Sequence, residues 1–132
     1  MAESILVVED DPTLARAVAR NLAARGYTTH SAMTVADATE AIARARPALV
    51  VLDIELPDGS GWEVLRGLRD GGQPDVPAIV MSASRPNQRL ADELRVTGVL
   101  EKPFPMESLL RLVARCCGSS EPRISDDLEQ EG

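Results

Sequence analysis

The strongest constraint on the fold is an alternation between short apolar runs and stretches of helical periodicity, which repeats five times along the chain. Apolar runs of about four to eight residues are typical of buried strands, and apolar residues repeating every three or four positions indicate helices packed by one face. Strands that alternate with helices predict a parallel sheet with crossover helices. We therefore predict an α/β fold with a doubly wound, five-stranded parallel sheet.

Caps and breakers set the expected boundaries of these elements. The strands are expected at about 4–9, 27–30, 48–53, 77–82 and 98–101. The first helix begins after Asp11 as N-cap, with Pro12 at its first position, and stops at Gly26. Thr34 caps the second helix, in a weak capping box with Asp37, and Pro47 ends it.

The later helices are less uniform. The third is expected at about 61–69, and the last carries an inner stripe of Met106, Leu109, Leu110 and Val113. The fourth has Ser84 as its expected cap and Leu90 and Leu94 as its main apolar pair. It is polar, and we expect it to be mobile or to face a partner.

Charged side chains stand where three of the expected strands end. Asp53 closes an apolar run, Glu9 and Asp10 close another, and Lys102 follows the fifth strand. Ligands bind open parallel sheets at the carboxyl ends of strands, so these charges are expected to converge in one crevice. Lys102 is the single lysine among fourteen basic residues. A compact ammonium has properties that arginine lacks, which favours a specific role for this position.

Three carboxylates in one crevice must be neutralised, because like charges at close range raise one another's pKa. Mg²⁺ suits such a site, since it prefers one or two carboxylates together with water and phosphate oxygens. A shielded Asp53 could then attack phosphorus and form an aspartyl phosphate. Ser82, at the end of the fourth strand, and Lys102 would supply a hydroxyl and an ammonium to the phosphoryl oxygens.

Composition excludes several classes of function. A net charge of −7 argues against direct binding of nucleic acid, which needs a basic patch. Neither a membrane span nor a secretion signal is present in the sequence, so we expect a cytoplasmic protein. Cys116 and Cys117 are adjacent and too close for an ordinary disulfide, so we expect both to stay reduced. Five acids and one arginine in residues 119–132 predict an acidic, disordered tail after a domain at 1–118.

Four motifs in this order resemble the receiver domain of bacterial two-component response regulators. They are Ile5 to Pro12, Leu52 to Gly59, Met81-Ser82-Ala83 and Lys102-Pro103-Phe104, and the likeness runs from Ile5 to about Cys117. The resemblance implies a flavodoxin-like sheet of order 2-1-3-4-5 with five helices, and a cis bond between Lys102 and Pro103.

The resemblance also implies a role for each site residue. Asp53 would be the phosphoacceptor, Asp10 a direct Mg²⁺ ligand, Glu9 a ligand through water, Glu55 a ligand through its carbonyl, and Ser82 and Lys102 would bind the phosphoryl group. The phosphoryl group would come from a histidine kinase or a phosphotransfer protein. An output partner would bind the face formed by helix four, strand five and helix five. The protein would be a monomer or weak dimer, and it would not be an enzyme.

Three features depart from the family. The segment between Ser82 and Lys102 is short, which leaves the length of the fourth helix open. Val99 stands where the family usually has Tyr or Phe. No DNA-binding or catalytic output domain follows in this sequence, and whether a longer natural chain carries one stays open. Because Val99 has no ring to swing, we expect the signal to pass mainly through the loop from Ala83 to Pro86 and the fourth helix.

Two other functions are compatible with parts of the pattern. A degenerate receiver would bind partners without phosphorylation, for which the loss of the aromatic residue at Val99 is the main argument. A small phosphatase of the dehalogenase type would also form an aspartyl phosphate, but it resembles this chain less, because it carries a second Asp two residues after the nucleophile. Here that position is Glu55.

Overall fold

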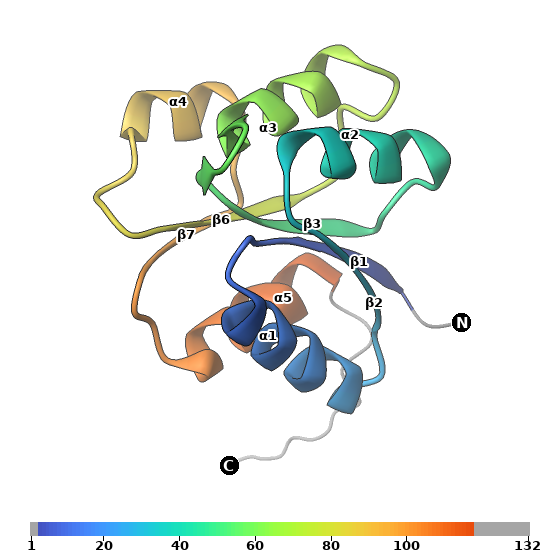
Figure 1. Ribbon diagram of the computed structural model, residues 1–132, viewed down its shortest axis with the longest axis vertical. Coiled ribbons are helices and arrows are strands. Elements are labelled where there is room, and N and C mark those ends of the chain that lie inside the picture. The colour runs from blue at the N-terminus through green and yellow to red at the C-terminus, as the bar shows by residue number, and fades with distance from the viewer. Residues whose placement is uncertain (1–2, 118–132) are drawn as a thin grey trace.

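Five parallel strands form the centre of the molecule, and helices cover both faces of the sheet (Figure 1). The computed structural model describes residues 3–117. The strands are β1 (Ser4–Val8), β2 (Thr28–Ala32), β3 (Leu49–Asp53), β6 (Ala78–Ser82) and β7 (Gly98–Glu101). Their order in the sheet is β2-β1-β3-β6-β7, and every neighbouring pair is parallel. This is the predicted order 2-1-3-4-5, with β6 and β7 as the fourth and fifth strands.

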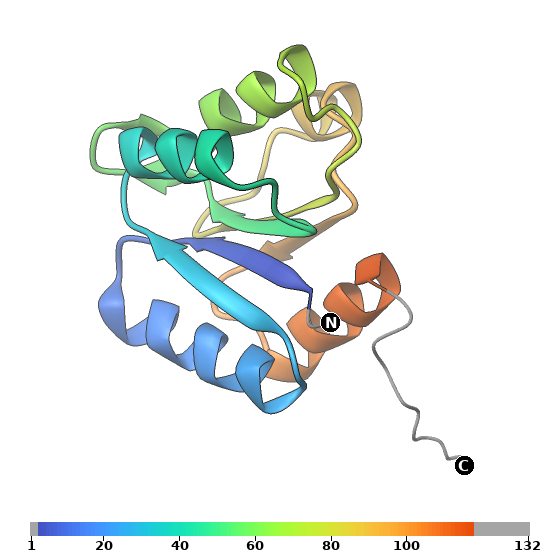
Figure 2. The same ribbon diagram turned by 90° about the vertical axis from the view of Figure 1, so that its right-hand side faces the viewer.

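Five helices connect the strands. They are α1 (Pro12–Ala24), α2 (Val35–Arg44), α3 (Gly61–Asp70), α4 (Gln88–Glu93) and α5 (Met106–Cys117). Helices α1 and α5 cover one face of the sheet, and α2, α3 and α4 cover the other (Figure 1). The edge strand β2 is seen most clearly in Figure 2. The predicted α/β fold class is therefore confirmed.

The buried strands supply both layers of the core, because successive side chains of a strand point to opposite faces. In β1, Ile5 and Val7 pack with α1 and α5, whereas Leu6 and Val8 pack on the side of α2 and α3. All five residues of β3 and all five of β6 are buried. Burial on both faces explains why these strands appear in the sequence as continuous apolar runs rather than as alternating patterns.

The caps explain where most helices begin. Asp11 accepts a hydrogen bond from the amide of Thr13, and Thr34 accepts one from the amide of Asp37. Helix α3 begins with a capping box between Ser60 and Glu63, which was not predicted from the sequence. Just before it, the short strands β4 (Glu55–Leu56) and β5 (Gly59–Ser60) form a two-stranded hairpin that was also unforeseen.

The expected cap of the fourth helix was wrong. Asn87, not Ser84, accepts from the first turn of α4, through the amide of Leu90. The reason is Pro86: a residue before proline is kept out of the helical region, so a helix capped by Ser84 would strain Arg85. The helix therefore starts late and has only six residues.

The end of α4 is fixed more firmly than its start. The Arg69 guanidinium of α3 donates from Nε to the carbonyl of Leu94 at 2.7 Å, and from Nη1 to the carbonyls of Val76 at 2.7 Å and Pro74 at 3.0 Å. Arginine suits this role because its donors are held in a rigid planar fork. Arg69 thus ties the end of α4 to the segment that enters β6.

Both cysteines are thiols, as predicted. Burial is the main influence on them, and it raises the pKa of Cys116 and raises that of Cys117 to about 12. Thiols with raised pKa values are poor nucleophiles. Across residues 3–117, each helix is too short or too polar to cross a bilayer. The expected tail at 119–132 lies outside the described residues.

Candidate functional site

The carboxyl ends of four strands meet at one edge of the sheet and deliver the predicted side chains there. Glu9 follows β1, Asp53 ends β3, Ser82 ends β6 and Lys102 follows β7. Asp53 is paired in register with Met81, so Ser82 lies one residue further along the neighbouring strand. Glu9, Asp53 and Ser82 are buried polar residues, with exposed fractions of 1%, 2% and 1%.

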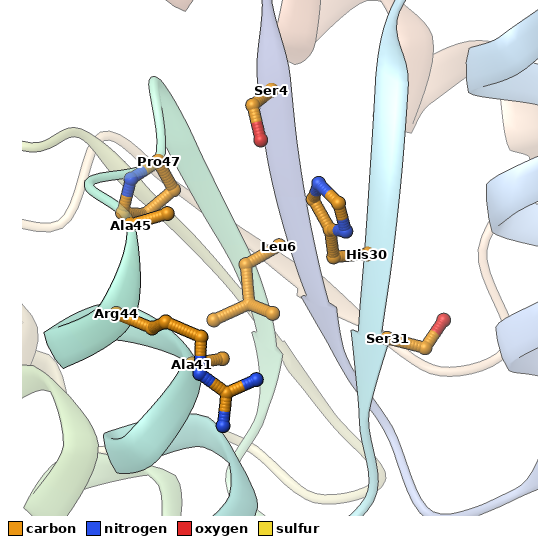
Figure 3. Close-up of a pocket in the computed structure, with 8 residues that line it drawn as sticks. All are labelled: Ser4, Leu6, His30, Ser31, Ala41, Arg44, Ala45 and Pro47. Atoms are coloured by element: carbon orange, nitrogen blue, oxygen red, sulfur yellow. The ribbon is translucent and has the colours of Figure 1, made fainter.

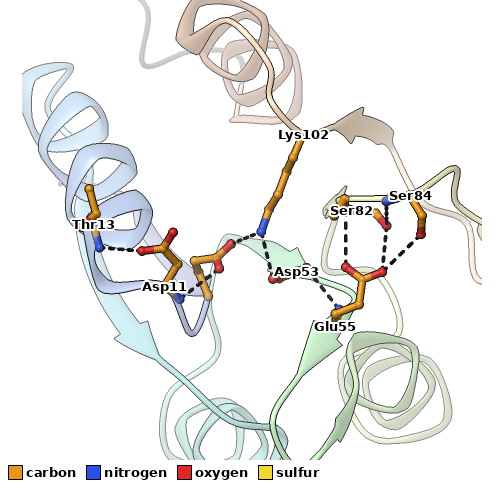
Figure 4. A network of polar contacts seen from close by, with 9 residues as sticks. Asp11, Thr13, Asp53, Glu55, Ser82, Ser84 and Lys102 are labelled. Carbon is orange, nitrogen blue, oxygen red and sulfur yellow. Dashed lines mark hydrogen bonds and ion pairs between the residues drawn. The ribbon is translucent and has the colours of Figure 1, made fainter.

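Lys102 joins the two buried carboxylates. Its Nζ lies 2.9 Å from Oε1 of Glu9 and 3.0 Å from Oδ2 of Asp53 (Figure 4). The Lys102-Pro103 peptide bond is cis, as predicted. A single ammonium therefore bridges two acids that come from different strands.

The electrostatics of this trio follow from burial and pairing. Burial raises the pKa of Glu9, and the hydrogen bond from Lys102 only partly offsets it. Burial would lower the pKa of Lys102, but its hydrogen bonds to Glu9 and Asp53 outweigh burial and raise that pKa above its ordinary value. The ammonium is thus held charged, as a partner of buried carboxylates should be.

Among residues 3–117, one group of acids has the arrangement of a cation site. Glu9, Asp10 and Asp53 each place an oxygen within 4.8 Å of the others. Glu9 also accepts a hydrogen bond from the amide of Asp11 at 3.1 Å, which orients its carboxylate. These are hard oxygen donors, partly buried and close together, and so they fit the preferences of Mg²⁺.

The backbone around Asp53 is closely packed. Asp53 Oδ1 accepts from the amide of Glu55 at 3.1 Å, and the amide of Gly61 donates to the carbonyl of Ile54 at 2.8 Å. A Cβ added at Gly61 would collide with the backbone carbonyl of Asp53. Glycine at this position thus permits the start of α3 to lie directly against the strand end that carries Asp53.

Asp58 attaches the loop after Asp53 to a second helix. Its Oδ1 accepts from the amide of Val35 at 2.7 Å and its Oδ2 from the amide of Ala36 at 3.1 Å. The bond from Val35, the largest influence, holds the pKa of Asp58 below its usual value. The sequence indicated only a turn residue at Asp58, and the turn motif gave no sign of a contact with α2.

The side chain of Glu55 was also missed. The resemblance pointed to its carbonyl, but its carboxylate turns toward the end of β6 and contacts Ser82 and Ser84 (Figure 4). An exposed acid in a two-residue strand carries no local pattern that predicts a contact 27 residues away along the chain.

Two cavities lie at different distances from this edge of the sheet. One, of about 410 Å³, adjoins the crevice and is lined by Asp11, Leu14, Lys102, Pro103, Phe104 and Met106. The other, of about 320 Å³, lies beside β1 and β2 and includes Ser4, His30 and Arg44 (Figure 3). Ser4 begins β1 while Glu9 follows its end, so the second cavity is remote from the acids.

Comparison with known families and proteins identifies the class of this domain. Residues 5–114 match the model of the response regulator receiver domain family. The chain is 40% identical to the transcriptional regulatory protein KdpE of Mycobacterium tuberculosis over 108 residues, which covers 80% of this chain and 47% of that protein. It is 38% identical to the response regulator MprA of Mycobacterium ulcerans over 112 residues, covering 83% of this chain and 48% of that protein.

Solved structures agree with this assignment. The non-phosphorylated HemR receiver domain from Leptospira biflexa has a TM-score of 0.81 and 29% identity, covering 92% of this chain and 98% of that one. The receiver domain of the sensor histidine kinase PA1611 from Pseudomonas aeruginosa, with magnesium coordinated in its active-site cleft, has a TM-score of 0.79 and 25% identity. It covers 90% of this chain and 100% of that one.

The chain therefore belongs to the receiver domains of two-component response regulators. It spans about half the length of the curated relatives that it matches.

Proposed function

We propose that Asp53 is the phosphoacceptor of this receiver domain. The observation that carries this proposal is the position of Asp53: a buried carboxylate at a strand end, one oxygen of which is paired with Lys102 at 3.0 Å. Asp53 attacks phosphorus, a P–O bond forms, and the bond from phosphorus to the donor breaks. With a phosphohistidine donor, the electrons of the P–N bond go to the imidazole nitrogen.

Lys102 and Ser82 bind the phosphoryl group in this proposal. The Lys102 ammonium is already charged and lies next to Asp53, so it is placed to offset the negative charge of phosphoryl oxygens. Ser82 is buried one residue beyond the position paired with Asp53, where its hydroxyl can donate to the same group. Phosphoryl transfer depends mostly on such positioning and charge stabilisation.

A divalent cation fits the same crevice. Glu9, Asp10, Asp53 and the carbonyl of Glu55 would hold Mg²⁺, and the donor set of clustered carboxylates supports this. Bound Mg²⁺ neutralises carboxylates and the charge that develops during phosphoryl transfer. The magnesium-bearing relative in the same fold is consistent with this choice of ion.

The phosphodonor is a histidine kinase or a phosphotransfer protein, and the cavity lined by Leu14, Phe104 and Lys102 offers it an apolar surface. We further propose that α4, β7 and α5 contact the output partner, and that this domain itself does not bind nucleic acid. Turnover is limited to loss of its own phosphoryl group.

The test is phosphorylation by acetyl phosphate in the presence of Mg²⁺, followed by intact mass measurement. The wild-type protein should gain one phosphoryl group, and Asp53→Asn should gain none. Asp70→Asn, which changes an exposed aspartate at the end of α3, is the matched control and should be modified like the wild type. Unmodified wild-type protein with Mg²⁺ bound would favour the degenerate receiver, which binds its partner without phosphorylation.

A further inference from the structure

Three hydrogen-bond donors at the end of β6 converge on one carboxylate, that of Glu55. The hydroxyls of Ser82 and Ser84 lie 3.3 Å and 3.4 Å from Oε2, and the amide of Ala83 lies 3.4 Å from Oε1 (Figure 4). Glu55 belongs to β4, just after Asp53, so the contacts join the loop after β3 to the loop after β6. The Glu55 side chain is exposed, in contrast to the buried acids Glu9 and Asp53.

These donors are limited in number. A serine hydroxyl has one proton to donate, and a backbone amide has one. The Ser82 hydroxyl also accepts from the amide of Ser84 at 3.3 Å, so its own proton is directed to Glu55. In the proposed function the Ser82 hydroxyl donates to a phosphoryl group on Asp53, since Ser82 lies one residue beyond the position paired with Asp53. The carboxylate and the phosphoryl group therefore compete for the same donor.

We propose that the Glu55 carboxylate holds the Ser82–Ser84 segment in the unphosphorylated protein, and that a phosphoryl group on Asp53 displaces this carboxylate. We call the three contacts of the Glu55 carboxylate the latch. This inference rests on the proposed role of Asp53. Glu55 acts through Ser82 and is a positioning residue. The latch sets how readily the domain switches, since it stabilises the unphosphorylated arrangement only.

The geometry makes displacement feasible. The three contacts are 3.3 to 3.4 Å long, near the limit for hydrogen bonds, and the carboxylate is exposed, so it can turn into water without burying a charge. A phosphoryl group adds negative charge beside Glu55, and like charges repel. The Glu55 backbone has its own contact, since its amide donates to Asp53 Oδ1 at 3.1 Å, so the position of the backbone does not depend on the three side-chain contacts.

The experiment uses beryllofluoride, a reversible mimic of the phosphoryl group, with saturating Mg²⁺ and calorimetric titration. Glu55→Gln keeps the shape of the side chain and removes its charge, and Glu55→Ala removes all three contacts. Because hydrogen bonds to a charged group are worth more than neutral ones but these are long and exposed, we expect both variants to bind beryllofluoride roughly three- to tenfold more tightly than the wild type. Adding Ser84→Ala to Glu55→Gln should bring little further gain, since both changes open the same contact.

The control is Glu101→Gln. Glu101 is an exposed acid at the same edge of the sheet, paired in register with Ser82, and its removal changes the net charge equally. Its affinity for beryllofluoride should match the wild type. A general loss of structure would weaken beryllofluoride binding, whereas loss of the latch strengthens it, so the direction of the change in affinity separates the two. The Ala83 amide should exchange faster in Glu55→Gln than in the wild type, and equally once beryllofluoride is bound.

The outcomes separate the two proposals. Wild-type protein that binds beryllofluoride with an affinity unchanged in both Glu55 variants would overturn the latch alone, as would an equal gain in Glu101→Gln. Wild-type protein that binds no beryllofluoride and accepts no phosphoryl group would overturn the proposed function, and the latch with it.

Discussion

The two sides of Asp53 are built differently. On one side, Lys102 lies 2.9 Å and 3.0 Å from carboxylates that are almost fully buried. On the other, the exposed Glu55 holds Ser82 and Ser84 at 3.3 Å and 3.4 Å. Short contacts between buried charges are preorganised, whereas long contacts at the surface exchange easily with water. The side that would stabilise charge is thus assembled in advance, and the side that would transmit a signal is held loosely.

Removing the Lys102 ammonium should have the largest effect. Lys102→Ala leaves Glu9 buried without its partner, and such a loss strongly destabilises proteins. Because Lys102 is partly exposed, we expect the free energy of unfolding to fall by about 2–3 kcal/mol, somewhat less than for a fully buried pair. Urea unfolding at pH 7 measures this, and phosphorylation should be lost as well.

The pH dependence of that variant gives an internal check. The pKa of Glu9 is raised by burial, so protonated Glu9 is favoured in the folded state. The contribution of Glu9 to the free energy of unfolding is most favourable below its ordinary pKa of 4.5, and it is lost as the pH rises through the raised pKa of the folded state. The defect in Lys102→Ala should therefore be smaller near pH 4.5 than at pH 7. An equal defect at both pH values would contradict the account of Glu9 as an uncompensated charge.

The second test concerns the packing behind Asp53. Gly61→Ala would push a Cβ into the carbonyl of Asp53, and we expect a loss of stability of about 1–3 kcal/mol because the strand end must shift. Gly67→Ala, in the same helix, meets nothing within 4 Å and should stabilise the protein by about 0.5–1 kcal/mol. Thermal unfolding of both variants gives the contrast. Equal effects would show that the backbone of Asp53 tolerates displacement.

The smallest expected effect on stability is at Asp58, which, like Glu55, is an exposed acid that accepts hydrogen bonds from a distant segment. Hydrogen bonds from the amides of Val35 and Ala36 lower the pKa of Asp58. Its contribution to the stability of the fold is therefore present above its ordinary pKa of 3.8, and it is lost as the pH falls through the lower pKa of the folded state. Asp58→Asn should unfold at a slightly lower temperature at pH 7, and the difference should close below pH 3.8. A difference that persists in acid would mean that Asp58 acts in some other way.

The sequence was most informative about the side of Asp53 that carries Lys102 and Glu9. The alternation of strand and helix patterns located the five strands, although β2 is largely polar, and a single lysine among fourteen basic residues marked Lys102. Strand ends in a parallel sheet meet at one edge, so the order of residues along the chain was enough to place Glu9, Asp53 and Lys102 together. The strand order and the cis bond at Lys102 came from the family resemblance rather than from periodicity.

The side of Asp53 that carries Glu55 was harder to predict. Glu55 in β4 and Asp58 in the turn after it are exposed acids, and their contacts with Ser82 and with α2 depend on how distant segments are placed. The cap of α4 was missed because Ser84 is a common type of cap, although Pro86 keeps the residue before it out of the helical region. The consequence of Val99 for signalling remains a prediction.

The six-residue length of α4 has a mechanical consequence. A helix of this length is about 9 Å long, and Arg69 pins the residue that follows it, Leu94, to the segment before β6. Its other end continues into the loop that Glu55 touches. Because one end of α4 is fixed at Leu94, we expect any movement of the Ser82–Ser84 loop to tilt α4 rather than translate it.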